Sequence, residues 1–126
     1  MPVPSQDTTS NALVAVVDDD EDVRAALDGL LGSLGYRAVL FDTADALLAS
    51  TLLNEVDCII SDVQMPGSSG LQLAEAVQPQ SIPIILITAF PTPEVDQRAA
   101  AAGVISLLVK PFESSDLIEQ LAELLD

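Results

Sequence analysis

Apolar residues in this chain form short continuous runs that alternate with longer amphipathic stretches. The five runs have the length of strands, and they lie at 13–17, 38–41, 58–60, 83–88 and 104–109. The amphipathic stretches carry apolar residues at spacings of three and four, which predicts helices at 21–34, 43–53, 71–77, 93–102 and 114–125. Several runs lack polar alternation, as strands buried on both faces do. The pattern therefore predicts one α/β domain with a parallel sheet wrapped by helices.

Glycines mark the expected ends of two of these helices. Gly35 follows the first helix and Gly103 follows the fourth, at the positions where glycine commonly ends a helix. The fourth helix contains four alanines at 99–102, which favour helix formation but offer little area to bury. A helix that is only weakly attached to the rest of the domain could move in a switch. An ordinary surface helix with small side chains fits the same pattern.

Length and composition indicate one domain. With 126 residues and 49% hydrophobic residues, the chain has enough apolar material for one core. The polar, proline-containing segment 1–11 predicts a flexible N-terminal tail, and 12–126 predicts the folded domain. No apolar stretch approaches the roughly 18 residues that span a bilayer, and the N-terminus lacks the pattern of a signal peptide. We therefore expect a soluble cytoplasmic protein without membrane contact.

The charge balance and the rare residue types exclude several functions. Asp and Glu number 20 against 4 Lys and Arg, giving a net charge of -16, so direct nucleic-acid binding is not expected. The chain has no histidine, which excludes imidazole general-base chemistry and histidine metal sites. The single cysteine, Cys58, lies in an apolar run and predicts a buried free thiol.

Acidic residues mark the ends of two of the predicted strands. Asp18 and Asp19 follow the first strand, and the third strand ends in Asp62. The remaining acidic residues of the DDDED segment, 20–22, suit the N-terminus of a helix, where a side-chain cap and the helix dipole favour them. Parallel sheets bind ligands at the carboxyl ends of their strands. If the first and third strands are neighbours, three carboxylates meet there.

Such a cluster favours a hard cation. Two unit charges ~5 Å apart repel by roughly 3 kcal/mol at an effective dielectric constant of about 20. Because the ligands are oxygens, and neither histidine nor a second cysteine is present, Mg²⁺ suits the site better than zinc.

Two further polar residues belong to the same sheet edge. Lys110 is the only lysine of the chain and follows the fifth strand, which points to a fixed ammonium group facing a phosphoryl group; a plain ion pair is the alternative. Thr88 ends the fourth strand. Taken alone, that hydroxyl is an ordinary strand-end residue.

Together, the ordered motifs resemble the receiver domain of two-component response regulators. They are the acidic pair at 18–19, Asp62 followed by VQMPGSSG, Thr88 followed by alanine, and Lys110 followed by PFE. The resemblance covers 12–125 and is most similar to the FixJ-type branch, whose receivers usually precede a DNA-binding domain. The chain stops at Asp126, so we expect no output domain in it.

The resemblance implies a fold, a reaction and a metal. The fold is a flavodoxin-like three-layer sandwich with a five-stranded parallel sheet in the order 2-1-3-4-5. Asp62 accepts a phosphoryl group from a partner, either a sensor histidine kinase or a phosphotransfer protein. Asp19 and Asp62 hold Mg²⁺ directly, Asp18 holds it mainly through water, and the backbone carbonyl of Gln64 completes the protein ligands. Thr88, Ala89 and Lys110 contact the phosphoryl group, and no external substrate is turned over as by an enzyme.

Departures from the family pattern concern switching and lifetime. Leu107 stands where receivers usually carry an aromatic ring, and Pro91 and Pro93 restrict the loop that leads to the fourth helix. By resemblance, Gln64 and Phe90 flank the approach of the hydrolytic water, and Phe90 is expected to shield the phosphoryl group. A long-lived phosphorylated state would then act through the face of the fourth helix, fifth strand and fifth helix, by forming a homodimer or binding a partner.

Two other functions fit part of the sequence. A receiver-fold module that signals without phosphorylation would keep the fold but not the chemistry, and the complete set of polar residues argues against it. A haloacid-dehalogenase-type phosphatase also uses acidic residues after a strand with Thr, Lys and Mg²⁺, and DDDED imitates its first motif. The turn after Asp62 and the short chain argue against this phosphatase.

Overall fold

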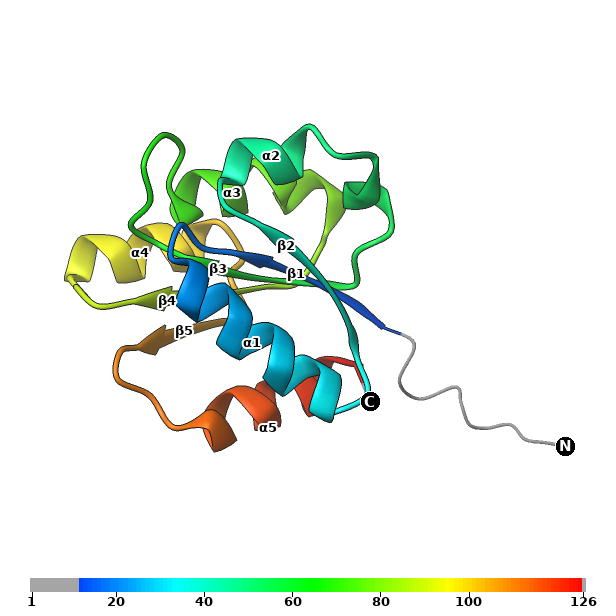
Figure 1. Cartoon of the computed structure of the whole chain (residues 1–126). Coiled ribbons are helices and arrows are strands. Elements are labelled where there is room, and N and C mark those ends of the chain that lie inside the picture. Colours follow the sequence, from blue (N-terminus) through cyan, green and yellow to red (C-terminus); the bar gives the residue numbers. More distant parts are fainter. Residues whose placement is uncertain (1–11, 126) are drawn as a thin grey trace, which may run out of the picture.

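The sheet has the predicted architecture. A computed structural model describes residues 12–125. Its five strands are β1 (Leu13–Val17), β2 (Arg37–Phe41), β3 (Cys58–Asp62), β4 (Ile84–Thr88) and β5 (Ser106–Val109). All neighbouring strands pair in parallel, in the order β2-β1-β3-β4-β5 (Figure 1). The predicted flavodoxin-like topology is therefore confirmed.

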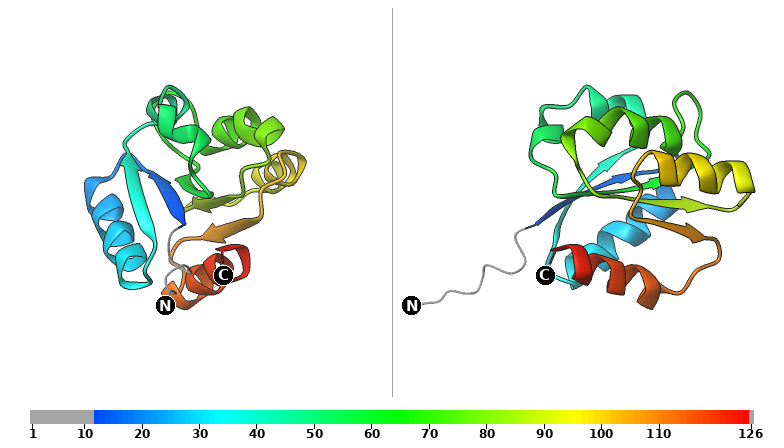
Figure 2. Two further views of the ribbon diagram at one scale, coloured as in Figure 1. Left: turned by 90° about the vertical axis from the view of Figure 1, so that its right-hand side faces the viewer. Right: turned by 180° about the vertical axis from the view of Figure 1, so that it is seen from behind.

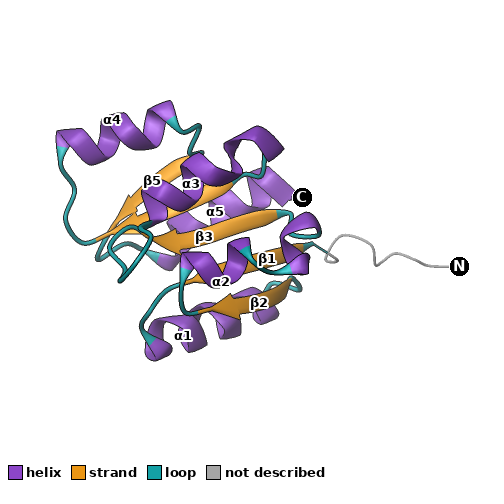
Figure 3. Cartoon of the chain, turned by 90° about the horizontal axis from the view of Figure 1, so that it is seen from above, coloured by secondary structure: helices purple, strands orange, loops and turns teal. Residues whose placement is uncertain are grey.

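Helices cover both faces of this sheet. They are α1 (Glu21–Ser33), α2 (Ala44–Leu48), α3 (Gly70–Val77), α4 (Pro93–Ala101) and α5 (Ser114–Leu125), with 3-10 turns η2 (Thr51–Asn54) and η3 (Gln78–Gln80). α1 and α5 lie on one face, and α2, α3 and α4 lie on the other (Figures 2 and 3). Within residues 12–125, no helix is both long and apolar enough to cross a membrane.

Each face of the sheet has its own hydrophobic core. On the α1 and α5 side, Leu27, Leu31, Leu117 and Leu121 are buried against β1, β3 and β4. On the other side, the buried apolar residues of α2 and α3 pack against β1, β3 and β4; they are Ala44, Leu47, Leu71, Leu73, Ala74 and Val77. β1, β3 and β4 are buried along their whole length, as their continuous apolar sequence predicts.

The helix predicted at 43–53 is wrong as a continuous element. α2 ends at Leu48, and η2 begins as a separate turn at Thr51. The hydroxyl of Ser50 accepts a hydrogen bond of 3.0 Å from the amide of Leu52, which gives the backbone an alternative to the helical pattern. The other predicted strands and helices differ from the observed bounds by no more than two residues at either end.

The predicted glycine positions are confirmed at both helix ends. Gly35 and Gly103 have φ values of 89° and 76°, in the left-handed region that other residues avoid. Ala99 is the buried residue of α4, and its C-cap Ala102 is buried as well, so the attachment of this helix rests on small side chains. Cys58 is fully buried and free, and burial raises the pKa of its thiol to about 12, which keeps it protonated.

Candidate functional site

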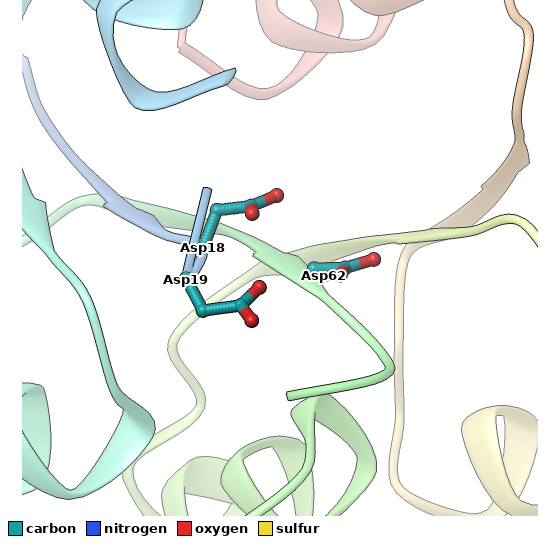
Figure 4. A group of neighbouring side chains, drawn as sticks. All are labelled: Asp18, Asp19 and Asp62. Atoms are coloured by element: carbon teal, nitrogen blue, oxygen red, sulfur yellow. The ribbon is translucent and has the colours of Figure 1, made fainter. Parts of the chain in front are cut away.

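The carboxyl ends of β1 and β3 bring together the three predicted aspartates. β1 pairs directly with β3, so Asp18 and Asp19 lie beside Asp62 at one edge of the sheet (Figure 4). One carboxylate oxygen of each residue lies within 4.8 Å of the others. This spacing allows a single cation to contact all three groups.

Asp18 is the most constrained of the three carboxylates. Its side chain is buried, and its Oδ1 accepts a 2.9 Å hydrogen bond from the amide of Asp20. Its Oδ2 is also buried and has no hydrogen-bond partner among the described residues. Burial raises the pKa of Asp18, with the Asp20 amide and Lys110 opposing the shift. A buried carboxylate oxygen without a donor is suited to a cation or to a water bound to one.

Asp62 lies between a cation and its acidic neighbours. The Nζ of Lys110 is 3.7 Å from its Oδ1, and the residue is only 8% exposed. Burial raises the pKa of Asp62, the charge of Lys110 lowers it, and Asp18 raises it further. The ammonium group therefore favours the ionised carboxylate, which is the nucleophilic form.

The acidic segment after β1 divides between the site and the helix. Asp20 caps α1, because its Oδ1 accepts hydrogen bonds from the amides of Asp22 and Val23. Glu21 and Asp22 occupy the exposed first turn, where the helix dipole favours negative charge. The division expected from the sequence is confirmed: 18–19 face the site and 20–22 begin the helix.

Thr88 brings β4 to the same edge of the sheet. Its buried hydroxyl donates a 3.0 Å hydrogen bond to Oε1 of Gln64 and accepts one from the amide of Phe90. Since a hydroxyl has one proton, Thr88 must leave Gln64 before it donates to another group. Ala89 is exposed, and the side chain of Phe90 is 68% exposed.

The loop from β4 to α4 has the predicted restriction. The hydroxyl of Thr92 accepts a 3.1 Å hydrogen bond from the amide of Val95, and Pro93 begins α4. A capping threonine followed by proline fixes the start of this helix. Leu107 lies on β5 opposite Leu86 and packs, partly buried, against the core beneath α2, α3 and α4.

Two residues that support the site were not identified from the sequence. Gly70 lies so close to β3 that a Cβ atom there would come within 2.3 Å of the Asp62 carbonyl oxygen. Arg24 reaches back from α1, and its Nη1 donates a 2.7 Å hydrogen bond to the carbonyl of Asp18. Only the spacing of six residues between Asp18 and Arg24, one helical turn beyond the cap, hints at this contact.

The chain belongs to the response regulator receiver domain family, which matches residues 14–122. Receiver domains are signalling phosphoacceptors of two-component systems, and the acidic pocket of this chain is consistent with that function. The transcriptional regulatory protein FixJ of Bradyrhizobium diazoefficiens is 34% identical over 111 residues, which cover 86% of this chain and 54% of FixJ. This match agrees with the FixJ-type resemblance. The chain spans about half the length of the curated relatives it matches.

Solved structures with the same fold support this assignment. The chemotaxis protein CheY4 of Vibrio cholerae is 33% identical with a TM-score of 0.82, covering 92% of this chain and 100% of that chain. The response regulator TrrA of Thermotoga maritima, in complex with Mg²⁺-BeF, is 29% identical with a TM-score of 0.80. That match covers 90% of this chain and 99% of TrrA.

Proposed function

We propose that Asp62 is the phosphoacceptor of this receiver domain and that its donor is the phosphohistidine of a sensor histidine kinase or phosphotransfer protein. The observation that carries the proposal is the position of Asp62, within 4.8 Å of two other carboxylates and 3.7 Å from Lys110. In the reaction an oxygen of Asp62 forms a bond to phosphorus as the bond from phosphorus to the histidine nitrogen breaks. The product is an aspartyl phosphate and a histidine without its phosphoryl group.

Mg²⁺ fits the donor set of this site. The site offers three clustered carboxylates, one of which has a buried oxygen without a donor. Asp19 and Asp62 would hold the ion directly, Asp18 through water, and Gln64 through its backbone carbonyl. When bound, the ion neutralises charge on the phosphoryl oxygens. The complex of TrrA with Mg²⁺-BeF supports this choice of metal.

The other polar residues contact the transferred group. Lys110 supplies a fixed positive charge to the phosphoryl oxygens, and the amide of Ala89 and the hydroxyl of Thr88 donate to them. For Thr88 this means exchanging Gln64 for the phosphoryl group as acceptor. The loop that contains Phe90 is bonded to the same hydroxyl, so this exchange is transmitted toward α4.

Two surfaces suit the partners of this reaction. An apolar groove of about 630 Å³ lies beside Lys110, with Leu27 and Leu30 of α1 on one side and Phe112 and Leu117 on the other. A phosphodonor with an apolar surface would bring its histidine close to Asp62 from this groove. β5 is an edge strand of the sheet, and the apolar residues Val109 at its end and Ile105 just before it are exposed, which suits phosphorylation-dependent pairing through α4, β5 and α5.

Labelling with a small phosphodonor tests the assignment. We expect acetyl phosphate to add one phosphoryl group to the wild-type protein, located on Asp62 by mass spectrometry, and only when Mg²⁺ is present. The protein receives the group once rather than turning over a substrate, so steady release of product from a small phosphoester would favour the phosphatase alternative. Absence of any label, together with a normal fold, would favour the module that signals without phosphorylation.

Mg²⁺ is expected to stabilise the folded chain. At a free concentration about ten times the dissociation constant, the free energy of unfolding should rise by ~1.4 kcal/mol, because the ion binds only the folded cluster. Urea unfolding followed by circular dichroism with and without millimolar Mg²⁺ measures the gain. The control is a buffer without divalent cations that is adjusted to the same ionic strength, since general screening by salt also weakens the repulsion between carboxylates.

The lifetime of the aspartyl phosphate is expected to be set by the residue at position 90. An apolar Phe90 offers no hydrogen bond to an attacking water, whereas a glutamate there would orient one. We expect Phe90→Glu to release phosphate about tenfold faster than the wild type, measured by loss of label over time. Slower release from the variant would contradict the shielding by Phe90.

A further inference from the structure

Arg24 joins the first turns of α1 to the carboxyl end of β1. Its backbone amide donates a 3.0 Å hydrogen bond to the carbonyl of Asp20. Its side chain turns back, and Nη1 donates a 2.7 Å hydrogen bond to the carbonyl of Asp18. The residue is half-buried, so both bonds are partly withdrawn from water. Arg24 is thereby tied to two points of the short segment that carries Asp18 and Asp19.

The carbonyl of Asp18 belongs to the peptide unit that separates the two carboxylates. The orientation of this unit sets the backbone angles on either side of it, and these angles direct the side chains of Asp18 and Asp19. The amide of Asp18 is already bonded to the carbonyl of Phe41, and the amide of Asp20 is bonded to Asp18 Oδ1. The hydrogen bond from Arg24 therefore adds a third restraint to this turn, at the peptide between Asp18 and Asp19.

The acceptor that Arg24 uses is informative. The guanidinium group lies next to a cluster of carboxylates, yet it donates its hydrogen bond to a neutral carbonyl oxygen. The carboxylate oxygens therefore stay available to a cation. Lys110, in contrast, points its charge at Asp62. The two cations beside the site thus differ in what they hold: Lys110 holds the acceptor carboxylate and Arg24 holds backbone.

We propose that Arg24 is a positioning residue that fixes the peptide between Asp18 and Asp19, so that both carboxylates are directed toward Mg²⁺. The inference rests on the proposed function, because the ion is the group for which the carboxylates are held. Repulsion among three carboxylates favours their turning apart in the absence of a cation. A guanidinium bond to the connecting carbonyl opposes this movement before the ion binds.

Charge and positioning predict opposite effects when Arg24 is removed. Loss of a positive charge beside the cluster makes the local potential more negative, which by itself tightens cation binding. Loss of the bond to the Asp18 carbonyl releases the turn, which weakens cation binding because the carboxylates must be ordered on binding. The sign of the change in Mg²⁺ affinity therefore separates the two roles.

Isothermal titration with MgCl₂ measures this sign. For Arg24→Ala we expect about tenfold weaker Mg²⁺ binding than in the wild type, the usual size of the effect when a residue that orients metal ligands is lost. Arg98→Ala is the matched control, because it also removes one positive charge, but from α4, where Arg98 pairs with Glu75 at 3.4 Å. We expect its affinity to stay within about twofold of the wild type.

Arg24→Lys keeps the charge but replaces the planar donor group with a shorter ammonium group. We expect its Mg²⁺ affinity to lie between those of the wild type and Arg24→Ala. If circular dichroism shows that Arg24→Ala is unfolded, Arg24→Lys is compared with the wild type instead. A readout without metal accompanies it: the amide proton of Asp20, bonded to Asp18 Oδ1, should exchange faster in the Arg24 variants and not in Arg98→Ala.

Several outcomes would overturn the inference. Unchanged or tighter Mg²⁺ binding by Arg24→Ala would remove the positioning role, as would an equal loss in Arg98→Ala. If the wild type binds Mg²⁺ and accepts the phosphoryl group while Arg24→Ala behaves identically, only this inference fails. If the wild type binds no Mg²⁺, the proposed function fails first.

Discussion

Asp62→Asn is expected to abolish labelling by acetyl phosphate while making the metal-free protein more stable. Among the described residues, the variant loses the one carboxylate that pairs with Lys110, at 3.7 Å, so no acceptor remains where we expect the phosphoryl group to be held. Asn has nearly the same shape as Asp, and it removes one charge from the cluster. We expect the free energy of unfolding without Mg²⁺ to rise by about 1–2 kcal/mol at neutral pH.

The pH dependence of this gain follows from the raised pKa of Asp62. Burial raises that pKa above its unfolded value of 3.8, so the folded protein favours the protonated acid. The stability that the protonated group contributes is fully present below the unfolded pKa and is lost as pH rises through the folded pKa. Asn does not ionise, so its contribution to stability does not change with pH. The variant should therefore gain over the wild type as pH rises from 4 to 7, and the two should converge on acidification.

Asp42→Asn is the matched control for this experiment. Asp42 directly follows β2 at the same edge of the sheet, but it is exposed and lies outside the cluster of three carboxylates. We expect normal labelling and a change in unfolding free energy within about 0.5 kcal/mol. Label that persists in Asp62→Asn, or that disappears equally in Asp42→Asn, would contradict the assignment of the phosphoacceptor.

The sheet and the acidic site could be predicted because their determinants are local. Buried parallel strands require continuous apolar sequence, and such strands end at polar residues that stay close to the sheet edge. The positions of Asp18 and Asp62 follow from those two facts and from the pairing of β1 with β3. The same reasoning located Thr88 and Lys110, each at the end of a strand.

The remaining features depend on distances between elements, which a single sequence does not contain. The bond between Thr88 and Gln64 depends on side-chain rotamers in two separate loops. The break after α2 depends on a competing hydrogen bond that the Ser50 hydroxyl accepts from the amide of Leu52, and hydrophobic periodicity does not reveal such a bond. The contact of Arg24 depends on how far its side chain reaches back from α1.

The close approach of α3 to β3 has the largest consequence among these unpredicted features. Gly70 begins α3, and its amide donates a 3.0 Å hydrogen bond to the carbonyl of Val63, the residue after Asp62. A Cβ atom at this position would lie 2.3 Å from the carbonyl oxygen of Asp62, 3.0 Å from its carbonyl carbon and 3.1 Å from Leu86 Cδ2. Two of these atoms are backbone, so they cannot yield by a change of rotamer.

We therefore expect Gly70→Ala to lower the free energy of unfolding by about 1–3 kcal/mol, because a methyl group must push α3 away from β3. Gly29→Ala and Gly32→Ala provide controls of opposite sign. A Cβ atom at either position in α1 meets nothing within 4 Å, and alanine favours a helix over glycine by roughly 0.5–1 kcal/mol, so both should stabilise the protein. Urea midpoints from far-ultraviolet circular dichroism measure all three variants.

The same displacement is expected to reach the chemistry, because the atom that the new methyl group meets is the carbonyl of Asp62 itself. Moving this carbonyl shifts the carboxylate relative to Lys110 and to Asp18 and Asp19. Labelling of the folded Gly70→Ala variant should then be about tenfold slower than in the wild type, since small misplacements of reacting groups are costly. A destabilised variant that is labelled at the wild-type rate would show that α3 adjusts without moving β3.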